Sequence, residues 1–578
     1  MSPRGRAGAS ERLVVTLQRR RRFLVGEPLF ERGAQIALDR GARAEPGRMA
    51  LIEFGPGRAR VVRRLGSPDR ARDVVEALLW ERLGKRGFDD AVENEAKAAA
   101  ERAIAEPGAR EDLTDMATFT VDPATARDFD DAVSARRVKD GVRLWIHIAD
   151  VAAHVSPGSE LEREAFRRAN STYVPGTVEP MLPKALSADA CSLAPGVERL
   201  AVTTEIELGG AGEVRSSRFY RSRIRSDARL DYNQLEEVFA GRAKPPATAA
   251  EPLEIARSAA AALAQRPRSG ALEVQTAEPE FEFDADGDVI GAQGVEGTEA
   301  HRLIEQLMIL CNEQVASLLE EKRVPTVYRV HEQPDPERVA FMVEQLASLD
   351  LPTPPLPVRM APSEAAVVAG EASRLITAEA ARRGHGREAY TSLVLRSLQQ
   401  AHYSARNAGH AGLGSPAYCH FTSPIRRYPD LLVHRGLLSA VGEAERPPAA
   451  DLARDAAAHC SEAERESVVA ERDADDVCAA FLLERELLES GWDTEFVAEV
   501  SGVIGAGAFV RFGGRLGDVY EGFVPARRLR GERFELNEAQ TALVGAKTGR
   551  ALRFGDPIAV RVERVEAARG RVDLEPEG

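Results

Sequence analysis

The chain has 578 residues and a formal net charge of −14, so its length predicts about three domains, and its acidic balance is not typical of a nucleic-acid-binding protein. No apolar run approaches the ~18 residues of a membrane span, so we expect no membrane association. The five cysteines lie apart without a CxxC pair, which argues against a zinc site or a disulfide framework and fits a cytoplasmic protein.

Basic residues are nevertheless clustered in short runs, such as Arg221-Ser-Arg-Ile-Arg225. Two interpretations of each run stay open. Either the run lines a path that binds phosphate groups in a protein that is acidic as a whole, or the run is a solvated part of the surface.

The first part of the chain predicts a small barrel followed by helices. Residues 11–65 alternate short apolar stretches with glycine-containing turns, which is typical of antiparallel strands. Helical periodicity follows over about 69–84 and 90–105. We therefore place a first domain at residues 1–112, made of a barrel and a helical connector.

The middle of the chain predicts one large α+β domain over residues 113–490. Strand-like segments begin at Thr118 and are separated by an acidic segment and by an irregular proline-rich segment. Helical periodicity then dominates, over residues 299–320, 337–348, 362–383, 388–405, 429–441 and 451–489. The pattern is too continuous to divide into smaller domains.

The last part of the chain predicts a second barrel. Five strand-like segments lie between Thr494 and Leu574, which is typical of a closed five-stranded OB barrel. This third domain spans residues 493–578. The expected fold class is therefore a multidomain α+β protein in which small β-barrel (OB-fold) domains flank a large central domain.

A short acidic segment within the central domain carries the strongest chemical signal. It places four carboxylates in one stretch, Asp122, Asp128, Asp130 and Asp131. Carboxylates that meet repel one another, so either some are protonated or a divalent cation, for which Mg²⁺ is the best candidate, holds them ionised. The alternative is a capped turn with solvated aspartates.

The spacing of these aspartates excludes an EF-hand and leaves their convergence open. An EF-hand loop starting at Asp128 needs Gly at its sixth position and Glu at its twelfth, and this chain has neither. In an extended segment Asp128 and Asp130 share one face, while Phe129 packs inward on the other. Asp131 joins them only where the backbone turns, so convergence of all four is a hypothesis.

A second candidate site is the stretch Thr422-Ser-Pro-Ile-Arg-Arg-Tyr-Pro-Asp430. Pro429 favours the first turn of a helix, so Arg426 and Arg427 are expected in a loop beside a helix N-terminus. Backbone N–H groups and guanidinium groups there bind phosphate oxygens, which suits a scissile phosphate. The alternative is a structural ion pair with Asp430.

Four motifs together carry a family resemblance. They are DPATARDFDDA, WIHIADVAAHV, RRANSTYVPGTVEPMLPKALSADACSL and HFTSPIRRYPDLLVHR, in that order. Over residues 113–490 the chain strongly resembles the catalytic domain of the RNase II/RNase R (RNB) family of processive 3′-to-5′ exoribonucleases. The flanking barrels resemble the family's N-terminal cold-shock-type domain and its C-terminal OB domain of the ribosomal S-one type.

The resemblance implies Mg²⁺-dependent, processive hydrolysis of single-stranded RNA from its 3′ end to nucleoside 5′-monophosphates, and we expect a monomer. The family's metal ligands correspond to Asp122, Asp128, Asp130 and Asp131. Its catalytic residues correspond to Asp130, Asp128 and Arg426, of which Asp130 is the aspartate on which catalysis depends most. Its RNA-binding residues correspond to Tyr232, which stacks on the terminal nucleotide, Glu471, near the RNA end, and Arg427.

Some alternatives stay open beside the resemblance. Considered alone, Tyr232 fits a buried core tyrosine and Glu471 an exposed partner of a neighbouring arginine. Family members often carry two N-terminal barrels where this chain has room for one, and Ala506 and Pro525 replace residues common at the RNA-facing surface of the last barrel. A catalytically silent RNA-binding protein on the same scaffold is the alternative function, and the presence of all four aspartates and Arg426 favours the enzyme.

Overall fold

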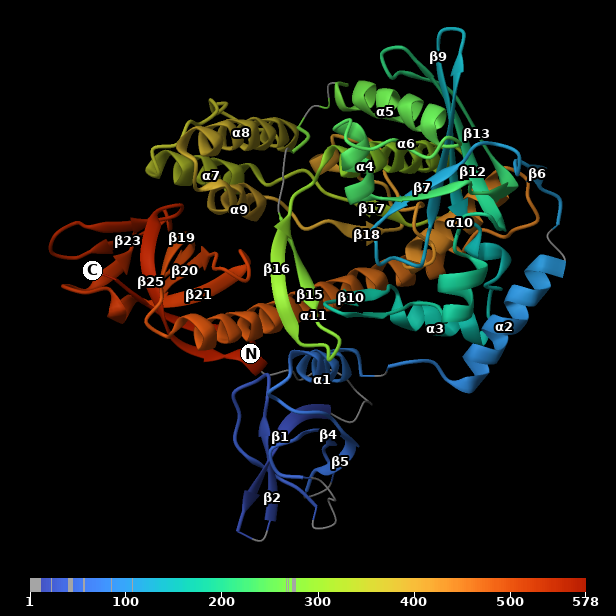
Figure 1. Cartoon of the computed structure of the whole chain (residues 1–578). Helices are drawn as coiled ribbons and strands as arrows, with labels where there is room; N and C mark the ends of the chain where they lie inside the picture. Colours follow the sequence, from blue (N-terminus) through green and yellow to red (C-terminus); the bar gives the residue numbers. More distant parts are fainter. Residues whose placement is uncertain are drawn as a thin grey trace.

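A long helix connects the central part of the chain to the last barrel in the computed structural model shown in Figure 1. The structure describes residues 12–21, 23–39, 45–55, 58–84, 86–105, 108–266, 268, 270–272 and 277–577. The long helix, α11 (Ala450–Ser490), has 41 residues and spans about 60 Å. Within the described ranges, no helix combines the length and the apolar character that crossing a membrane requires.

The N-terminal sheet has five strands in the order β3-β2-β1-β4-β5. Its strands are β1 (Arg12–Arg20), β2 (Phe23–Pro28), β3 (Ile36–Ala37), β4 (Met49–Glu53) and β5 (Arg60–Arg64). A parallel bridge between Leu38 and Ala59 joins the two edges of the sheet, and Val15, Leu17 and Ile52 lie in its core. The sequence pattern predicted this small antiparallel arrangement but did not indicate β3.

Two helices follow this sheet, α1 (Ala71–Leu83) and α2 (Asp90–Ala105), as the periodicity predicted. Helix α1 buries Val74, Val75 and Leu78 and contacts β1, β4 and α11. Helix α1, which lies beside the long helix in Figure 1, therefore attaches the N-terminal sheet to the rest of the molecule. A second attachment is Arg569, which donates to the carbonyls of Pro28 and Leu29.

The central domain is built on a seven-stranded sheet in the order β14-β7-β8-β9-β12-β13-β6. Its strands are β6 (Glu111–Asp112), β7 (Phe119–Asp122), β8 (Asp131–Val138), β9 (Gly141–Ala149), β12 (Glu198–Gly209), β13 (Val214–Arg225) and β14 (Ala228–Asp231). Strand β9 is buried from Leu144 to Ala149, which explains its almost continuous apolar sequence. Packed on this sheet, or beside it, are α4 (Tyr232–Phe239), α5 (Ala250–Ala264) and α6 (Glu299–Glu321).

Shorter elements complete the central domain. They are α3 (Glu160–Arg168), β10 (Thr172–Val174), β11 (Thr177–Glu179), β15 (Glu278–Phe283), β16 (Val289–Val295), β17 (Tyr328–Val330), α7 (Pro336–Ser348), α8 (Pro362–Arg383), α9 (Arg387–Ser397), β18 (His402–Ser404) and α10 (Tyr428–Ala440). The helix predicted over 388–405 is wrong in its second half. The chain becomes extended at Leu398, and β18 then pairs with β17, so tertiary pairing overrides the local helical pattern.

The C-terminal part contains the predicted closed barrel of five strands, β19-β20-β21-β26-β25. These strands are β19 (Glu495–Ile504), β20 (Gly507–Phe512), β21 (Tyr520–Pro525), β25 (Pro557–Glu566) and β26 (Arg571–Pro576). A second, three-stranded sheet that the sequence did not indicate lies between β21 and β25 in the chain. Its strands are β22 (Phe534–Leu536), β23 (Ala542–Gly545) and β24 (Ala551–Arg553).

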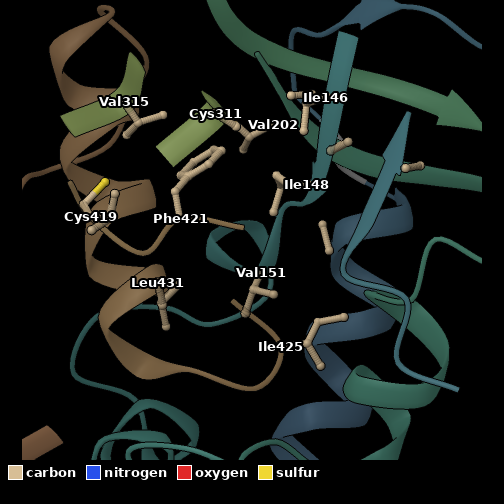
Figure 2. Packing of buried hydrophobic residues seen from close by; sticks show 14 of the residues in the cluster. Ile146, Ile148, Val151, Val202, Cys311, Val315, Cys419, Phe421, Ile425 and Leu431 are labelled. Carbon is tan, nitrogen blue, oxygen red and sulfur yellow. The ribbon is translucent and has the colours of Figure 1, made fainter. Parts of the chain in front are cut away.

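Two large hydrophobic cores hold these parts together. The first fills the central domain, and in Figure 2 Phe421 and Ile425 belong to one packed cluster with Ile148, Val151 and Val202. The second joins α1, helices α7 to α9, the end of α11 and the C-terminal barrel. The barrel therefore shares a core with the end of the long helix.

Glu81 on α1 provides a test of how the N-terminal sheet is attached. Its carboxylate accepts the N–H of Val14 at 2.6 Å, and burial raises the pKa of Glu81 from 4.5 to about 7. Because the folded state holds this proton more tightly than the unfolded state, stability declines as the pH rises between these two values. We expect Glu81→Gln, which keeps the acceptor without the charge, to flatten that decline in the thermal unfolding midpoint.

The matched control is Glu76→Gln, since Glu76 lies on the same helix with a side chain that is 49% exposed. In this variant the thermal unfolding midpoint should depend on pH as steeply as in the wild-type chain. The account of Glu81 is wrong if both variants show the same dependence of the midpoint on pH.

Candidate active site

The acidic segment connects two neighbouring strands of the central sheet, because β7 ends at Asp122 and β8 begins at Asp131. Phe129 is buried, as predicted. Its N–H donates to Ser192 Oγ at 3.1 Å, and its carbonyl accepts the N–H of Leu193 at 2.9 Å. The segment is therefore anchored on both its side chain and its backbone, which sets where the neighbouring carboxylates point.

Asp130 joins the acidic segment to the loop before α10 that carries Arg426 and Arg427, called the arginine loop from here on. Its Oδ1 accepts the N–H of Ile425 at 2.9 Å, across 295 residues of sequence. Its Oδ2 lies 3.7 Å from Nε of Arg426. The Asp130 carbonyl also accepts the N–H of Ala149, at the end of β9. The acidic segment and the arginine loop, the two candidate sites of the sequence analysis, thus meet at the Asp130 carboxylate.

Burial dominates the electrostatics of the acidic segment. It raises the pKa of Asp122 to about 8, with a further contribution from Asp131. It raises the pKa of Asp131 to about 6, against the opposing effects of Arg426 and Arg427. The pKa of Asp130 also lies well above its usual range, again because of burial. Burial therefore disfavours the ionised carboxylates, and a bound cation would favour their ionised form again.

The donor set fits a hard divalent cation such as Mg²⁺. One carboxylate oxygen each of Asp122, Asp130 and Asp131 is buried without a hydrogen-bond partner, and oxygen ligands of this kind are those that Mg²⁺ prefers. Across the described parts of the chain, however, no three His, Cys, Asp or Glu side chains already converge as a metal-binding group. The carboxylates are therefore neighbours rather than a preassembled cage.

Tyr173 on β10 is a residue of this site to which the sequence analysis assigned no role. Its hydroxyl donates to Asp128 Oδ2 at 2.8 Å, and its N–H donates to Glu471 Oε1 at 2.8 Å. Burial and the Asp128 carboxylate raise the pKa of Tyr173, while the residue as a whole remains 37% exposed. Tyr173 lies in one of the four family motifs, and that motif was the available sequence signal. Spacing alone, however, does not say which residue of the motif reaches the aspartates.

The two arginines of the loop have different environments. Arg427 donates to Asp430 with Nε at 2.9 Å and Nη2 at 2.7 Å, which is the ion pair considered as the alternative. Arg426 has a side chain that is 43% exposed, and its carbonyl accepts the N–H of Ser171. Of the two, Arg426 is the one with an accessible guanidinium, and an RNA-binding role for Arg427 stays a prediction.

Asp430 also shapes the loop itself. Its Oδ1 accepts the N–H of Ser423 at 2.8 Å, so one buried carboxylate holds both the start of the loop and Arg427. Helix α10 begins at Tyr428 with Pro429 in its first turn, as predicted. The loop is consequently fixed from the helix side by Asp430 and from the sheet side by Asp130.

The last two predicted site residues border the acidic segment. Tyr232 begins α4 and stacks on His301, with ring centroids 3.9 Å apart and an interplanar angle of 11°. Burial raises the pKa of Tyr232, and Asp131 and Asp122 contribute to the shift. Glu471 on α11 accepts the N–H of Tyr173. One face of the Tyr232 ring is therefore already occupied, and stacking of a terminal nucleotide on this residue stays a prediction.

The model of the RNB domain matches residues 110–443 of the chain. The chain belongs to the RNase II/RNase R (RNB) family of exoribonucleases. It is 32% identical to Ribonuclease R of Aquifex aeolicus, over 98% of this chain and 82% of that relative. It is 33% identical to Ribonuclease R of Escherichia coli strain K12, over 84% of this chain and 58% of that relative.

Solved structures agree with this family fold. A structure of Mycoplasma genitalium RNase R in complex with ribose-methylated single-stranded RNA aligns with a TM-score of 0.86 at 24% identity, and covers 98% of this chain and 90% of its own. Yeast Ssd1, described as a pseudonuclease, aligns with a TM-score of 0.67 at 17% identity, and covers 94% of this chain and 68% of its own. Both likenesses concern the fold.

In this RNB-family chain, the role of Asp430 can be tested by its removal. Asp430→Ala leaves the guanidinium of Arg427, whose side chain is 19% exposed, without its partner. Breaking a buried ion pair in this way should lower the free energy of unfolding of the central domain by about 3–5 kcal/mol, measured by chemical denaturation.

The matched control is Asp451→Ala. Asp451 also pairs with an arginine three residues away, Arg454, but both side chains are well exposed, at 84% and 68%. We expect little change there, because a solvated pair contributes little. Equal effects of the two substitutions would contradict the importance assigned to the buried pair.

Proposed function

We propose that this protein is a Mg²⁺-dependent exoribonuclease that removes nucleoside 5′-monophosphates processively from the 3′ end of single-stranded RNA. The observation that carries the proposal is the meeting of the acidic segment and the arginine loop at Asp130. Carboxylates for a cation and a guanidinium for phosphate charge lie side by side there, which is a combination suited to phosphodiester hydrolysis.

The arginine loop is suited to binding the scissile phosphate. The guanidinium of Arg426 is partly exposed, while its backbone is held by the N–H of Ser171. The N-terminus of α10 lies directly after it and adds a favourable dipole for an anion. Arg426 can therefore stabilise the charge that grows on the phosphate oxygens in the transition state.

The acidic residues complete this arrangement. Asp122, Asp128, Asp130 and Asp131 would hold Mg²⁺, which activates water and neutralises phosphate charge. Tyr173 orients Asp128 through its hydroxyl and is tied to Glu471 through its backbone. These contacts fix Asp128 and Glu471 relative to each other before substrate binds. Less entropy is then lost when these groups are oriented for the reaction.

Relatives support the choice of substrate without deciding it. The Mycoplasma genitalium RNase R structures include complexes with single-stranded and with double-stranded RNA, and we propose single-stranded RNA as the partner of this chain. A silent RNA-binding scaffold is the alternative, and the likeness to yeast Ssd1 concerns the fold alone. The complete set of aspartates together with Arg426 favours the enzyme. A monomer in the cytoplasm stays a prediction.

The experiment that tests the proposal uses 5′-labelled single-stranded RNA. With Mg²⁺, the labelled strand should shorten from its 3′ end to one short product, without accumulating intermediates, and nucleoside 5′-monophosphates should appear. With EDTA, the strand should stay intact. Internal cleavage, or degradation that continues in EDTA, would refute the proposed reaction.

Substitution of Asp130 separates catalysis from binding. Asp130→Asn keeps an oxygen that can accept the N–H of Ile425 but removes the charge, so the loop should remain in place. We expect the rate of mononucleotide release to fall by about 100-fold or more, while the Kd for RNA changes little.

The control is Asp115→Asn, since the side chain of Asp115 is fully exposed and precedes the acidic segment. This variant should hydrolyse RNA at the normal rate. Near-normal turnover by Asp130→Asn would show that the chemistry does not depend on this carboxylate.

A further inference from the structure

Glu486, in the last turns of α11, is a buried carboxylate outside the candidate active site. The residue is 3% exposed. It accepts the N–H of Arg515 at 2.7 Å, the N–H of Leu516 at 3.0 Å and the hydroxyl of Tyr520 at 2.9 Å. These three donors belong to the connection between β20 and β21 and to the first residue of β21, so one side chain of the long helix holds the C-terminal barrel.

The same connection is held from a second side by the β15–β16 hairpin, which lies next to α11. The N–H of Ala292 donates to the carbonyl of Leu516 at 3.0 Å, and the N–H of Gly294 donates to Asp518 Oδ1 at 2.8 Å. The connection between β20 and β21 is therefore fixed between the helix and the hairpin, and both of these elements belong to the central domain.

Helix α11 also carries Glu471, which borders the candidate active site. Glu471 and Glu486 lie about 22 Å apart along the helix axis. On the barrel, Phe509 is 38% exposed and packs against Phe523 with ring centroids 5.0 Å apart. An exposed aromatic ring of this kind can stack on a base of single-stranded RNA without reading its sequence.

We propose that Glu486 is a positioning residue, which holds the C-terminal barrel at a fixed place relative to Glu471 so that one RNA strand contacts both. This inference rests on the proposed function. Two contact sites at a fixed separation bind one strand more tightly than either alone, because the second contact becomes intramolecular. If the barrel is no longer held in place, the affinity for a strand long enough to reach both sites should fall. The affinity for a short strand should not change.

The test measures equilibrium binding in EDTA, so that it does not depend on hydrolysis. Fluorescently labelled single-stranded RNAs of about 5 and about 25 nucleotides are titrated, because only the longer exceeds what one OB domain and one end site occupy. For Glu486→Ala we expect the Kd of the long RNA to rise about tenfold, while that of the short RNA stays within about twofold.

Glu489→Gln is the matched control on the same part of α11. Glu489 also contacts Arg515, but from the surface, where its side chain is 46% exposed. This variant should bind both RNAs normally. Circular dichroism and the thermal unfolding midpoint of each variant establish that the central domain is folded.

Gly514 provides a second, independent variant. A Cβ at this position would lie 2.3 Å from Oε1 of Glu486, so Gly514→Ala should displace the carboxylate from its donors and reproduce the length-dependent loss. Removing the Glu486 side chain also removes that collision. The double variant Gly514→Ala/Glu486→Ala should therefore bind no more weakly than Glu486→Ala alone.

Each outcome is decisive. The inference is overturned if Glu486→Ala leaves the long RNA unaffected, or if it weakens both RNAs by the same factor, which would indicate a general structural role. Additive losses in the double variant would also overturn it. If Glu486→Ala shows the length-dependent loss but the wild-type chain releases no nucleotides, the proposed function fails while the positioning role of Glu486 in RNA binding stands.

Discussion

The hydrogen bond from the Ile425 N–H to the Asp130 carboxylate is the contact on which the candidate site depends. It crosses almost the whole central domain in sequence and joins the loop between β7 and β8 to the loop before α10. A buried carboxylate without a donor is costly, so this bond also helps the fold to tolerate Asp130 in the interior. The contact that builds the candidate site thus also satisfies one of the two oxygens of this buried carboxylate.

Much of this site could be predicted because its residues lie in short, dense motifs. The inward packing of Phe129 followed from simple alternation in an extended segment, and Pro429 located the start of α10. The barrel at the C-terminal end followed from the spacing of its strands. In each case the determining interactions are local, so the sequence pattern contains them.

The remaining features depend on contacts that no local pattern contains. Arg426 and Arg427 are neighbours of the same type, and only the folded structure shows that Arg427 pairs with the buried Asp430 while Arg426 lies beside Asp130. Tyr173 acquires its place from a hairpin that brings it between Asp128 and Glu471. The early end of α9 reflects strand pairing between β17 and β18. Helix and strand propensities and hydrophobic periodicity do not determine these long-range contacts.

The separation of the two loops in sequence also has a consequence during synthesis of the chain. At typical rates of elongation, the arginine loop leaves the ribosome roughly 15–60 s after the acidic segment. Until then the carboxylates have neither the Ile425 N–H nor the Arg426 guanidinium beside them. The nascent chain therefore carries an incomplete site while it is still attached to its own messenger RNA. The two halves of the candidate site therefore come together only after most of the central domain has been synthesised.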